Sequence, residues 1–337
     1  MDKRIKEKQV VLYSPKWHSR LLDYMRKVFP YRDENYLDWW LSNMDSGNED
    51  DWSKCFIVSE DNEIIGCTTA IPIELYNEGK RIDFYFRGNT IISPEKRGKG
   101  ISKLLYDRVN TYNNWLSVGI TDIAWAIQPK FVKNFTPINP VNVYVSANGW
   151  LVLQLFRRFF GNKQRGMIFP EQIKLSKNDT FIKIDSVKDF CVPKSGRWTD
   201  DKVELVRDEA FLQKRYFDVY CSERYAIYRY EKNGMPNGFV VLRKMRYSGF
   251  DMVSVVDFRF AGRKDERKAF AIAQKTARMN KIGFVLAMSS RNFGLFGKPW
   301  IVKTPKKLNF AVGNKELDFN DMLVTSGDSD LDFVYYQ

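Results

Sequence analysis

The sequence predicts a mixed α/β (α+β) protein of two tandem domains, each a mixed, mostly antiparallel twisted sheet flanked by helices. Its 337 residues exceed the usual size of one domain, which is about 100 to 200 residues. In the first half, alternating apolar segments precede a glycine-rich loop and an amphipathic helix. The second half repeats this order of elements without the loop, so we expect a degenerate copy of the first domain.

Helical spacing predicts two helices near the start of the chain. Ser14 and Pro15 supply an N-cap and a first-turn proline, and the apolar residues that follow have helical spacing: Trp17, Leu21, Leu22, Met25, Val28 and Phe29. Pro30 ends this helix, and a second helix is expected over residues 35–43. The only histidine, His18, lies near the first helix start, where we expect a helix-surface role.

Short strands are expected in the rest of the first half. They are residues 9–13, 55–59, 63–73, 82–86, 91–93 and 123–127. A helix follows the glycine-rich loop, because apolar residues share one helical face there: Ile101, Leu104, Leu105, Val109 and Tyr112.

The second half echoes the first. Residues 56–70, FIVSEDNEIIGCTTA, resemble residues 226–242, AIYRYEKNGMPNGFVVL, in being a strand, a turn and a second strand containing glycine. The order of expected elements continues to match the first half: a strand over 253–260, a helix containing Phe270, Ala273 and Ala277, and a strand over 284–288. Basic residues accumulate between the halves, which is typical of a connector. We therefore expect domains over 1–160 and 201–337, joined by a basic connector over 161–200.

Composition excludes several classes of protein. Hydrophobic residues make up 44% of the chain and aromatic residues 15%, which excludes a mainly disordered protein. No apolar run approaches the roughly 18 residues that cross a bilayer, and the charged start MDKRIKEK is unlike a secretory signal, so we expect a cytoplasmic protein. Four widely spaced cysteines predict reduced core thiols and no metal site: Cys55, Cys67, Cys191 and Cys221.

The segment with the most chemical information is GNTIISPEKRGKGISKLLYDRV, residues 88–109. Glycines allow successive backbone N–H groups to point into one concavity, and the start of a helix adds the positive end of its dipole. Gly98 and Gly100 remove side chains that would block a phosphate, while Arg97 and Lys99 add positive charge. The segment therefore predicts a pyrophosphate site, and a simple helix-entry turn is the alternative.

Other phosphate loops fit this segment less well. A Walker A loop needs Ser or Thr after its GK pair, whereas Gly100 follows Lys99. A dinucleotide-binding fingerprint needs a third glycine where Lys103 stands. The preceding meander of strands also differs from the alternating strands and helices of a doubly wound sheet.

The segment SPEKRGKGISKLL resembles the acetyl-CoA pyrophosphate motif of the GNAT acetyltransferase superfamily. That motif has Gln or Arg, two residues, Gly, one residue, then Gly or Ala, and Arg97, Gly100 and Ser102 take its three defining positions. Ser102 departs from the motif but is still small. The resemblance covers residues 10–156, and Gly149 and Trp150 resemble the pair that precedes the family's late strand.

The resemblance implies acetyl-CoA as co-substrate, bound by Ile91 and Ile92 on the strand and by the loop residues Arg97, Gly98, Lys99, Gly100, Ile101 and Ser102. Backbone groups over 89–92 would bind the pantetheine arm and stabilise charge on the thioester oxygen. Tyr144 is the expected general acid, since family members often place a tyrosine on the helix before the glycine pair; a structural tyrosine is the alternative. The base stays open among Glu74, Asp83, Asp122 and a water chain.

The expected activity is acetyl transfer to an amine or hydroxyl of a small acceptor. Two GNAT-like halves and the ending VTSGDSDLDF resemble bacterial acetyltransferases of surface-polysaccharide synthesis, which suggests an amino sugar. The second half reads FAGRKDERKAF where the loop would occur, and its acidic residues would repel a pyrophosphate, so we expect one CoA site. Two alternatives stay open: a FemABX-like peptidyltransferase that uses aminoacyl-tRNA, and a non-catalytic acyl-CoA-binding protein.

The formal net charge of +13 predicts an anionic ligand. The phosphates of CoA would account for it without a polymer. No RNA-binding motif or regular basic stripe with interleaved aromatic residues is present in the sequence, so we expect no nucleic-acid partner.

Overall fold

The structure is a computed structural model that describes residues 8–30, 32–42, 54–159, 167–193, 197–247, 249–292 and 301–329. The chain divides into two compact units. The first comprises Met1–Leu75, Arg81–Ile138 and Asn309–Leu317, and the second comprises Tyr76–Lys80, Asn139–Leu308 and Asp318–Gln337. The domains expected from the sequence, which end at residue 160 and begin again at residue 201, describe two copies of one fold and not these compact units, so they stay a prediction.

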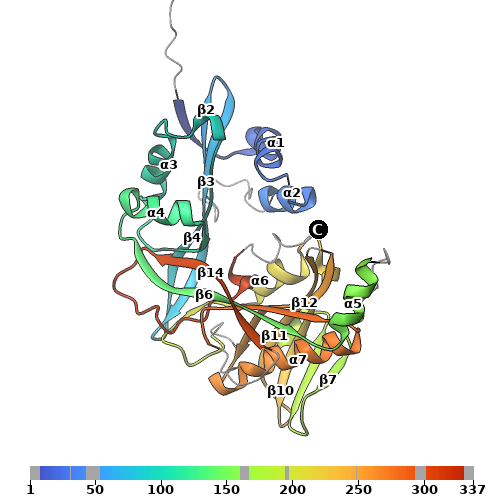
Figure 1. The fold of residues 1–337 in the computed structure, drawn as a ribbon. Coiled ribbons are helices and arrows are strands. Elements are labelled where there is room, and N and C mark those ends of the chain that lie inside the picture. The colour runs from blue at the N-terminus through green and yellow to red at the C-terminus, as the bar shows by residue number, and fades with distance from the viewer. Residues whose placement is uncertain are drawn as a thin grey trace, which may run out of the picture. The chain divides into compact units, whose positions relative to one another are not determined.

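The first unit is a sheet with helices on both faces. Its strand order is β1-β2-β3-β4-β5-β14, and only the end of β14, from Asn309, belongs to this unit. Helices α3 and α4 lie on one side of β2–β4, and α1 and α2 lie on the other (Figure 1). The elements are β1 (Lys8–Leu12), α1 (His18–Val28), α2 (Glu34–Ser42), β2 (Lys54–Glu60), β3 (Glu63–Asn77), β4 (Lys80–Ile92), α3 (Ile101–Val109), β5 (Trp115–Ile120) and α4 (Asp122–Phe131).

Helix α3 is held by its apolar face. Ile101 and Leu105 pack in one buried cluster with Val58 of β2 and Ile65 of β3. The other buried residues of the helix, Tyr106 and Val109, share a second cluster with Trp115 of β5. The helix predicted directly after the glycine-rich loop is confirmed, with Ile101, Leu105 and Val109 buried as expected. It ends at Val109, so Tyr112 lies beyond it, and Leu104 is only half-buried.

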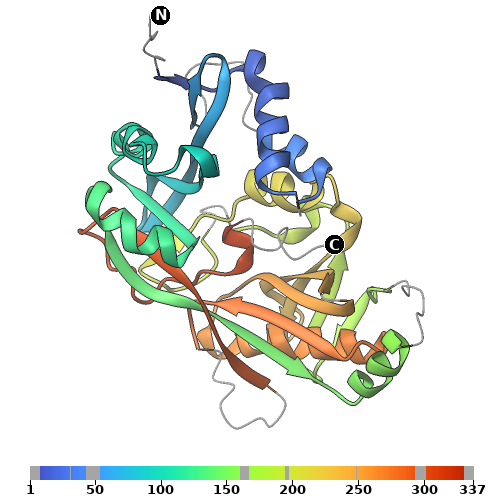
Figure 2. The same ribbon diagram turned by 45° about the horizontal axis from the view of Figure 1, so that its top comes forward.

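The second unit contains a larger mixed sheet. Its strand order is β6-β13-β12-β11-β10-β8-β7, and β6 runs antiparallel beside β13 (Figure 2). Helix α7 packs on β12 and β13. The elements are β6 (Thr136–Ala147), α5 (Trp150–Phe159), β7 (Gln172–Lys174), β8 (Asp179–Ile184), β9 (Val203–Leu205), α6 (Glu209–Leu212), β10 (Tyr225–Lys232), β11 (Met235–Tyr247), β12 (Phe250–Phe260), α7 (Arg267–Met279), β13 (Phe284–Ser289) and β14 (Ile301–Val312).

The two units share one order of elements. In the first, β2, β3 and β4 are followed by a 3-10 turn (Pro94–Lys96), helix α3 and strand β5, which is parallel to β4. In the second, the antiparallel strands β10, β11 and β12 are followed by a 3-10 turn (Arg263–Asp265), helix α7 and strand β13, parallel to β12. The predicted mixed α/β fold class is confirmed, and so is the echo in element order between the two halves.

Two segments differ from the secondary structure expected from the sequence. Residues 123–127 were expected to form a buried strand, but they lie in helix α4, and Ile123 is 74% exposed. Thr121 explains the helix, because its side chain accepts a hydrogen bond from the Ala124 N–H and caps it. The expected connector contains strands β7 and β8, and β8 pairs with β10. Its alternating sequence DTFIKI is a strand pattern that the surrounding lysines obscure.

Two residue placements also need correction. Gly149 precedes helix α5 and Trp150 is its first residue, so the pair leads into a helix instead of a late strand, because the Asn148 side chain accepts a hydrogen bond from the Trp150 N–H. Cys191 is exposed, whereas the other three cysteines are buried as expected. No helix among the described residues combines the length and the apolar character that crossing a membrane needs.

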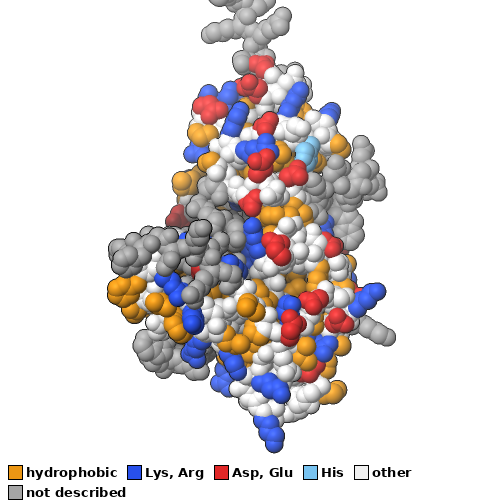
Figure 3. Space-filling model, turned by 90° about the vertical axis from the view of Figure 1, so that its right-hand side faces the viewer, with side chains coloured by type: hydrophobic (Ala, Val, Ile, Leu, Met, Phe, Trp, Pro, Cys, Tyr) orange, Lys and Arg blue, Asp and Glu red, His pale blue; other side chains and the backbone are white. Residues whose placement is uncertain are grey.

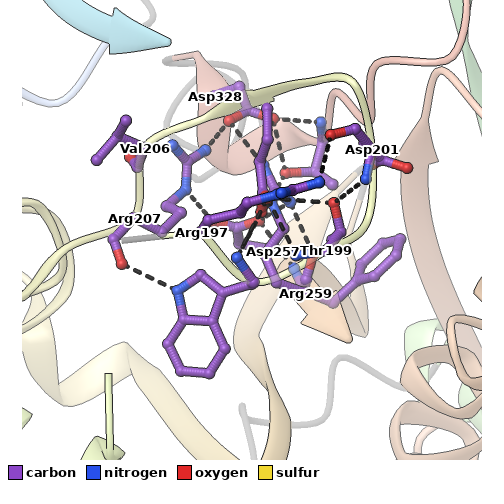
Figure 4. A network of polar contacts seen from close by, with 12 residues as sticks. Arg197, Thr199, Asp201, Val206, Arg207, Asp257, Arg259 and Asp328 are labelled. Atoms are coloured by element: carbon purple, nitrogen blue, oxygen red, sulfur yellow. Dashed lines mark hydrogen bonds and ion pairs between the residues drawn. The ribbon is translucent and has the colours of Figure 1, made fainter. Parts of the chain in front are cut away.

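A buried charge network holds the second unit together (Figure 4). Asp257 accepts hydrogen bonds from Arg207 Nε at 2.9 Å and Arg259 Nη1 at 2.6 Å, and all three side chains are almost fully buried. Asp328 forms ion pairs with both arginines, which ties the segment after β14 to the core. Burial opposes ionisation of Asp257, but the two arginines lower its pKa. Loss of one member would leave the remaining buried charges unbalanced, at a cost of about 3–5 kcal/mol.

Candidate functional site

The loop between β4 and α3 has the backbone geometry of an anion site. Gly98 and Gly100 have φ angles of +76° and +77°, in the left-handed region that favours glycine. A Cβ atom built at either position would meet nothing within 4 Å, so the space beside both glycines is open. The glycines are therefore needed for the backbone turn, and they leave room for a ligand to approach the backbone.

The start of helix α3 has free hydrogen-bond donors. Gly100 is its N-cap and offers no side chain to the first N–H groups of the helix. The first turn of an α-helix has no intrahelical acceptors for these N–H groups, which also carry the positive end of the helix dipole. A phosphate placed there would satisfy them, so the residues present fit the pyrophosphate of CoA.

Two cations border this helix start. Arg97 and Lys99 are exposed, and neither forms an ion pair with another described residue. Their neighbours are already paired, since Lys96 binds Glu60 and Lys103 Nζ lies 2.8 Å from Asp107 Oδ2. The charges of Arg97 and Lys99 are thus available to an anion at this helix start, and their role in binding CoA stays a prediction.

Strand β4 leads into the loop without a continuous partner on one side. The described register joins β4 to β5 only at Tyr85 and Phe86. Further along β4, Asn89 has a φ angle of +49°, which interrupts the regular strand. Backbone groups over 89–92, including those of Ile91 and Ile92, therefore lie beyond the part of β4 that pairs with β5. These are the residues expected to bind the pantetheine arm.

Arg87 lies directly after the last described β4–β5 pair, and its contacts join the elements around it. Its guanidinium donates hydrogen bonds to the carbonyls of Val109 and Tyr112, and it lies 4.4 Å from the centre of the Trp115 ring. Burial lowers the pKa of Arg87 to about 9. The side chain joins β4, the end of α3 and the start of β5. Sequence analysis missed this residue, because a single arginine within a strand carries no motif.

Polar side chains also line the end of β4 on the α3 side. Thr90 Oγ1 lies 2.7 Å from Thr68 Oγ1 on β3. Tyr106 of α3 forms hydrogen bonds with Thr90 and with Gln128 of α4, and burial raises the pKa of its hydroxyl. No sequence signal predicted this set, since threonine and tyrosine are ordinary strand and core residues.

The proposed acid and bases lie on different elements. Tyr144 lies on strand β6, not on a helix, in the second unit. Its hydroxyl has two acceptors, the Arg291 carbonyl at 3.2 Å and Asn292 Oδ1 at 3.0 Å, and burial raises its pKa. Among the carboxylates left open as bases, Glu74 forms an ion pair with Arg81 and Asp122 accepts a hydrogen bond from Asn309. No cluster of potential metal ligands occurs among the described residues.

In the second unit, the segment between β12 and α7 corresponds to the glycine-rich loop between β4 and α3, and it contains carboxylates. Asp265 and Glu266 are buried between β12 and α7. Asp265 pairs with Lys232 at 3.0 Å and Lys268 at 2.7 Å, and Glu266 pairs with Arg291. Gly262, the glycine of this segment, has a φ angle of −127°, which any residue adopts. These features separate the segment from the glycine-rich loop of the first unit.

Comparison with solved structures identifies the fold. A probable N-acyltransferase from Enterococcus faecalis matches with a TM-score of 0.58 at 11% identity, over 91% of this chain and 72% of that one. An Anabaena variabilis GCN5-related N-acetyltransferase matches with a TM-score of 0.57 at 13% identity, over 91% and 73%. The chain therefore has the GNAT fold.

The Saccharomyces cerevisiae N-myristoyltransferase with bound myristoyl-CoA has the same fold, with a TM-score of 0.55 at 12% identity over 90% of this chain and 82% of that one. No family profile matches the sequence, and no curated protein does. The GNAT-fold neighbours named here are acyltransferases that act on nitrogen, by their own descriptions. Because identity is this low, the likeness extends to the fold alone.

Proposed function

We propose that the protein is an acyl-CoA-dependent acyltransferase that moves an acetyl group to an amine or hydroxyl of a small acceptor. The loop of Arg97–Ser102 would bind the pyrophosphate of acetyl-CoA, and β4 beyond Phe86 would bind the pantetheine arm. One observation supports this most strongly: two left-handed glycines with open space stand directly before the uncapped start of α3. An amino sugar of surface-polysaccharide synthesis is the proposed acceptor.

The chemistry needs little from the protein beyond positioning. The acceptor nitrogen or oxygen attacks the thioester carbonyl carbon, the new bond forms and the carbon–sulfur bond breaks. The acceptor loses one proton and the departing thiolate gains one. Backbone N–H groups of β4 over 89–92 would stabilise negative charge on the carbonyl oxygen, which supplies the largest electrostatic contribution in acyl transfer.

Tyr144 is the proposed donor of the thiolate proton. The hydroxyl is protonated at neutral pH, as an acid requires, although burial raises its pKa and so weakens it as a proton donor. Tyr144→Phe deletes the hydroxyl and keeps most of the ring packing, so the proposal predicts about a hundredfold lower kcat with nearly unchanged stability. Steady-state rates and thermal unfolding measure both quantities. A variant with wild-type turnover would show that the hydroxyl has no catalytic role.

The positive charge of the chain is proposed to serve phosphorylated small molecules. On the face drawn in Figure 3, acidic and basic side chains are interspersed, so the described residues of this face form no long basic track for a polymer. Gel shifts with tRNA across a salt series test this. Micromolar tRNA binding that survives near physiological salt, without CoA release from acetyl-CoA in the presence of any small acceptor, would favour the peptidyltransferase alternative.

The direct test of the activity is release of free CoA. Acetyl-CoA is incubated with amino sugars, nucleotide sugars and simple amines, and the new thiol is measured. We expect acceptor-dependent release with acetyl-CoA, and myristoyl-CoA is run in parallel because a GNAT-fold neighbour binds it. Tight acetyl-CoA binding without release for any acceptor would support the acyl-CoA-binding alternative instead.

A further inference from the structure

Helix α5 of the second unit, at the margin of its sheet in Figure 1, exposes apolar side chains. Its inner face packs beside the start of β13, where the Gly283 N–H donates a hydrogen bond to Gln154 Oε1 at 2.9 Å. A Cβ atom at Gly283 would overlap the Leu151 backbone, so this contact is close. The outer face has i, i+3, i+4 spacing and consists of residues that are 58%, 39% and 59% exposed: Val152, Leu155 and Phe156. An exposed apolar stripe of this kind marks an interaction surface.

Further exposed apolar residues adjoin the start of α5. Lys281 Nζ lies 5.5 Å from the centre of the Trp150 ring, so the segment after α7 contacts the first residue of α5. Beside Lys281, the Asn280 side chain forms two hydrogen bonds with the Ile168 backbone, at 2.7 and 2.8 Å. Ile168 and Met279 are both exposed. We call the outer face of α5, together with these neighbours, the α5 surface.

The charge of the α5 surface is positive. Arg157, Arg278 and Lys281 form no ion pair with another residue in the described part of the chain. In the sequence, residues 157–165 include four basic residues and no acidic one. Asp251, an acidic residue beside α5, is half-buried on the inner side, where its carbonyl accepts a hydrogen bond from Gln154 Nε2 at 3.1 Å. The outer side of α5 therefore combines apolar side chains with positive charge that no described carboxylate balances.

This combination favours a lipid surface over a second copy of the chain. A specific protein interface buries about 800 Å² on each partner and needs complementary shape. The outer face of α5, in contrast, belongs to one convex helix of ten residues. In an isologous dimer, the cations of the two copies would also face one another. A membrane surface needs only a short apolar stripe that enters the lipid interface and basic residues that attract anionic headgroups.

We propose that the α5 surface binds the surface of an anionic lipid bilayer. Val152, Leu155 and Phe156 would enter the boundary between headgroups and acyl chains, and the exposed cations would contact lipid phosphates. The α5 surface belongs to the second unit and does not involve the Arg97–Ser102 loop. The proposal is therefore independent of the acyl transfer proposed above, and each can fail while the other stands.

Vesicle co-sedimentation of the full chain without acetyl-CoA tests the proposal. We expect vesicles of phosphatidylcholine with about one-third phosphatidylglycerol to bind the protein about tenfold more tightly than vesicles of phosphatidylcholine alone, because each cation near the surface adds attraction. Raising the salt concentration from about 0.1 M to about 0.5 M should remove most of this preference, since salt screens exposed charges.

A first double variant tests the apolar contribution. Val152→Gln with Phe156→Gln should lose about tenfold in affinity for the anionic vesicles, because two side chains no longer enter the lipid interface. The matched control is Ile123→Gln with Ile127→Gln, which removes two exposed apolar residues with the same spacing from α4 of the first unit. This control should leave vesicle binding unchanged.

A second double variant tests the charge. Arg157→Gln with Lys281→Gln should remove most of the preference of about tenfold for anionic vesicles. The matched control, Lys202→Gln with Lys264→Gln, removes the same charge from exposed lysines elsewhere in the second unit and should keep the preference.

Thermal unfolding and a separate acetyl-CoA titration check that each variant is folded, and the charge variant decides alone if the apolar variant unfolds. Equal binding to neutral and anionic vesicles, or no binding to either, would overturn the proposal. Unchanged binding in a variant of the α5 surface, or an equal loss in its control, would also overturn it. A dimer in sedimentation velocity that the apolar variant abolishes, without vesicle binding, would assign the α5 surface to a second copy instead.

Discussion

The same order of elements leads into helices α3 and α7, but the chain segment before each helix, here called its entry, has a different chemical environment. A strand, a 3-10 turn and a helix follow one another as β4, Pro94–Lys96 and α3, and again as β12, Arg263–Asp265 and α7. At the first entry two left-handed glycines leave the helix start open. At the second, Asp265 and Glu266 are buried among Lys232, Lys268 and Arg291.

This comparison shows that fold alone does not create an anion site. Both helices have the dipole and the free N–H groups of a helix start. The second entry already holds carboxylates, which repel phosphate and are satisfied by the protein's own cations. Neither helix start has a side-chain cap, but the segment before α3 contains no buried carboxylate, so an anion can approach the first N–H groups of that helix.

The largest effect is expected on acetyl-CoA affinity, from a substitution in the loop before α3. Gly100→Glu places a side chain and a negative charge in the open space before α3, so acetyl-CoA binding should become undetectable by calorimetry. Gly234→Glu is the matched control, because Gly234 has the same φ angle of +77° and the same open surroundings, in the β10–β11 turn. Both variants carry similar backbone strain. Equal acetyl-CoA affinity in the two variants would remove the case for this loop.

A smaller effect is expected at the second entry. Asp265→Ala leaves Lys232 without its carboxylate and removes one of two partners of Lys268, so we expect a loss of about 1–3 kcal/mol in the free energy of unfolding. Urea denaturation measures it, with Asp200→Ala as an exposed control. The variant should still bind one acetyl-CoA per chain. A second equivalent of bound acetyl-CoA would mean that carboxylates alone distinguish the entries.

The smallest effect concerns protonation beside α7. Partial burial of Asp179 opposes ionisation, but hydrogen bonds from Lys268 and Tyr230 lower its pKa to about 2. A lowered carboxylate pKa stabilises the fold above pH of about 4, and this contribution disappears as pH falls toward 2. In Lys268→Met the pKa of Asp179 should rise by about one unit, measured by carboxyl ¹³C titration. Lys275→Met, on the same helix, should leave it unchanged; an equal rise there would contradict the assignment.

Local sequence patterns predicted the part of the molecule that local physics determines. The Arg97–Ser102 loop, the amphipathic face of α3 and the repeated strand order follow from glycine conformation and hydrophobic periodicity, which act over a few residues. Hydrophobic periodicity misassigned residues 123–127, because a short run of apolar residues suits a strand or a helix equally well. The N-cap at Thr121 decides for the helix.

The features that sequence patterns missed depend on contacts between distant residues. Arg207, Asp257 and Asp328 meet in one buried network although they stand far apart in the chain. The π-helical turn Gln213–Phe217 joins the same network, because the Tyr216 hydroxyl donates a hydrogen bond to Asp257 Oδ2. Neither has a fixed spacing, so neither has a motif. Charged residues in a sequence are usually exposed, which makes a buried network hard to predict from composition.

The central claim is that acetyl-CoA binds the first helix entry and not the second. Backbone amide NMR spectra of the labelled protein, recorded during an acetyl-CoA titration, test it most directly. We expect the largest shift changes at the amides of Gly98, Gly100, Ile101 and Ser102, saturating at one ligand per chain. The largest changes at residues 262–267, or no change at the four loop amides when the ligand is bound, would contradict it.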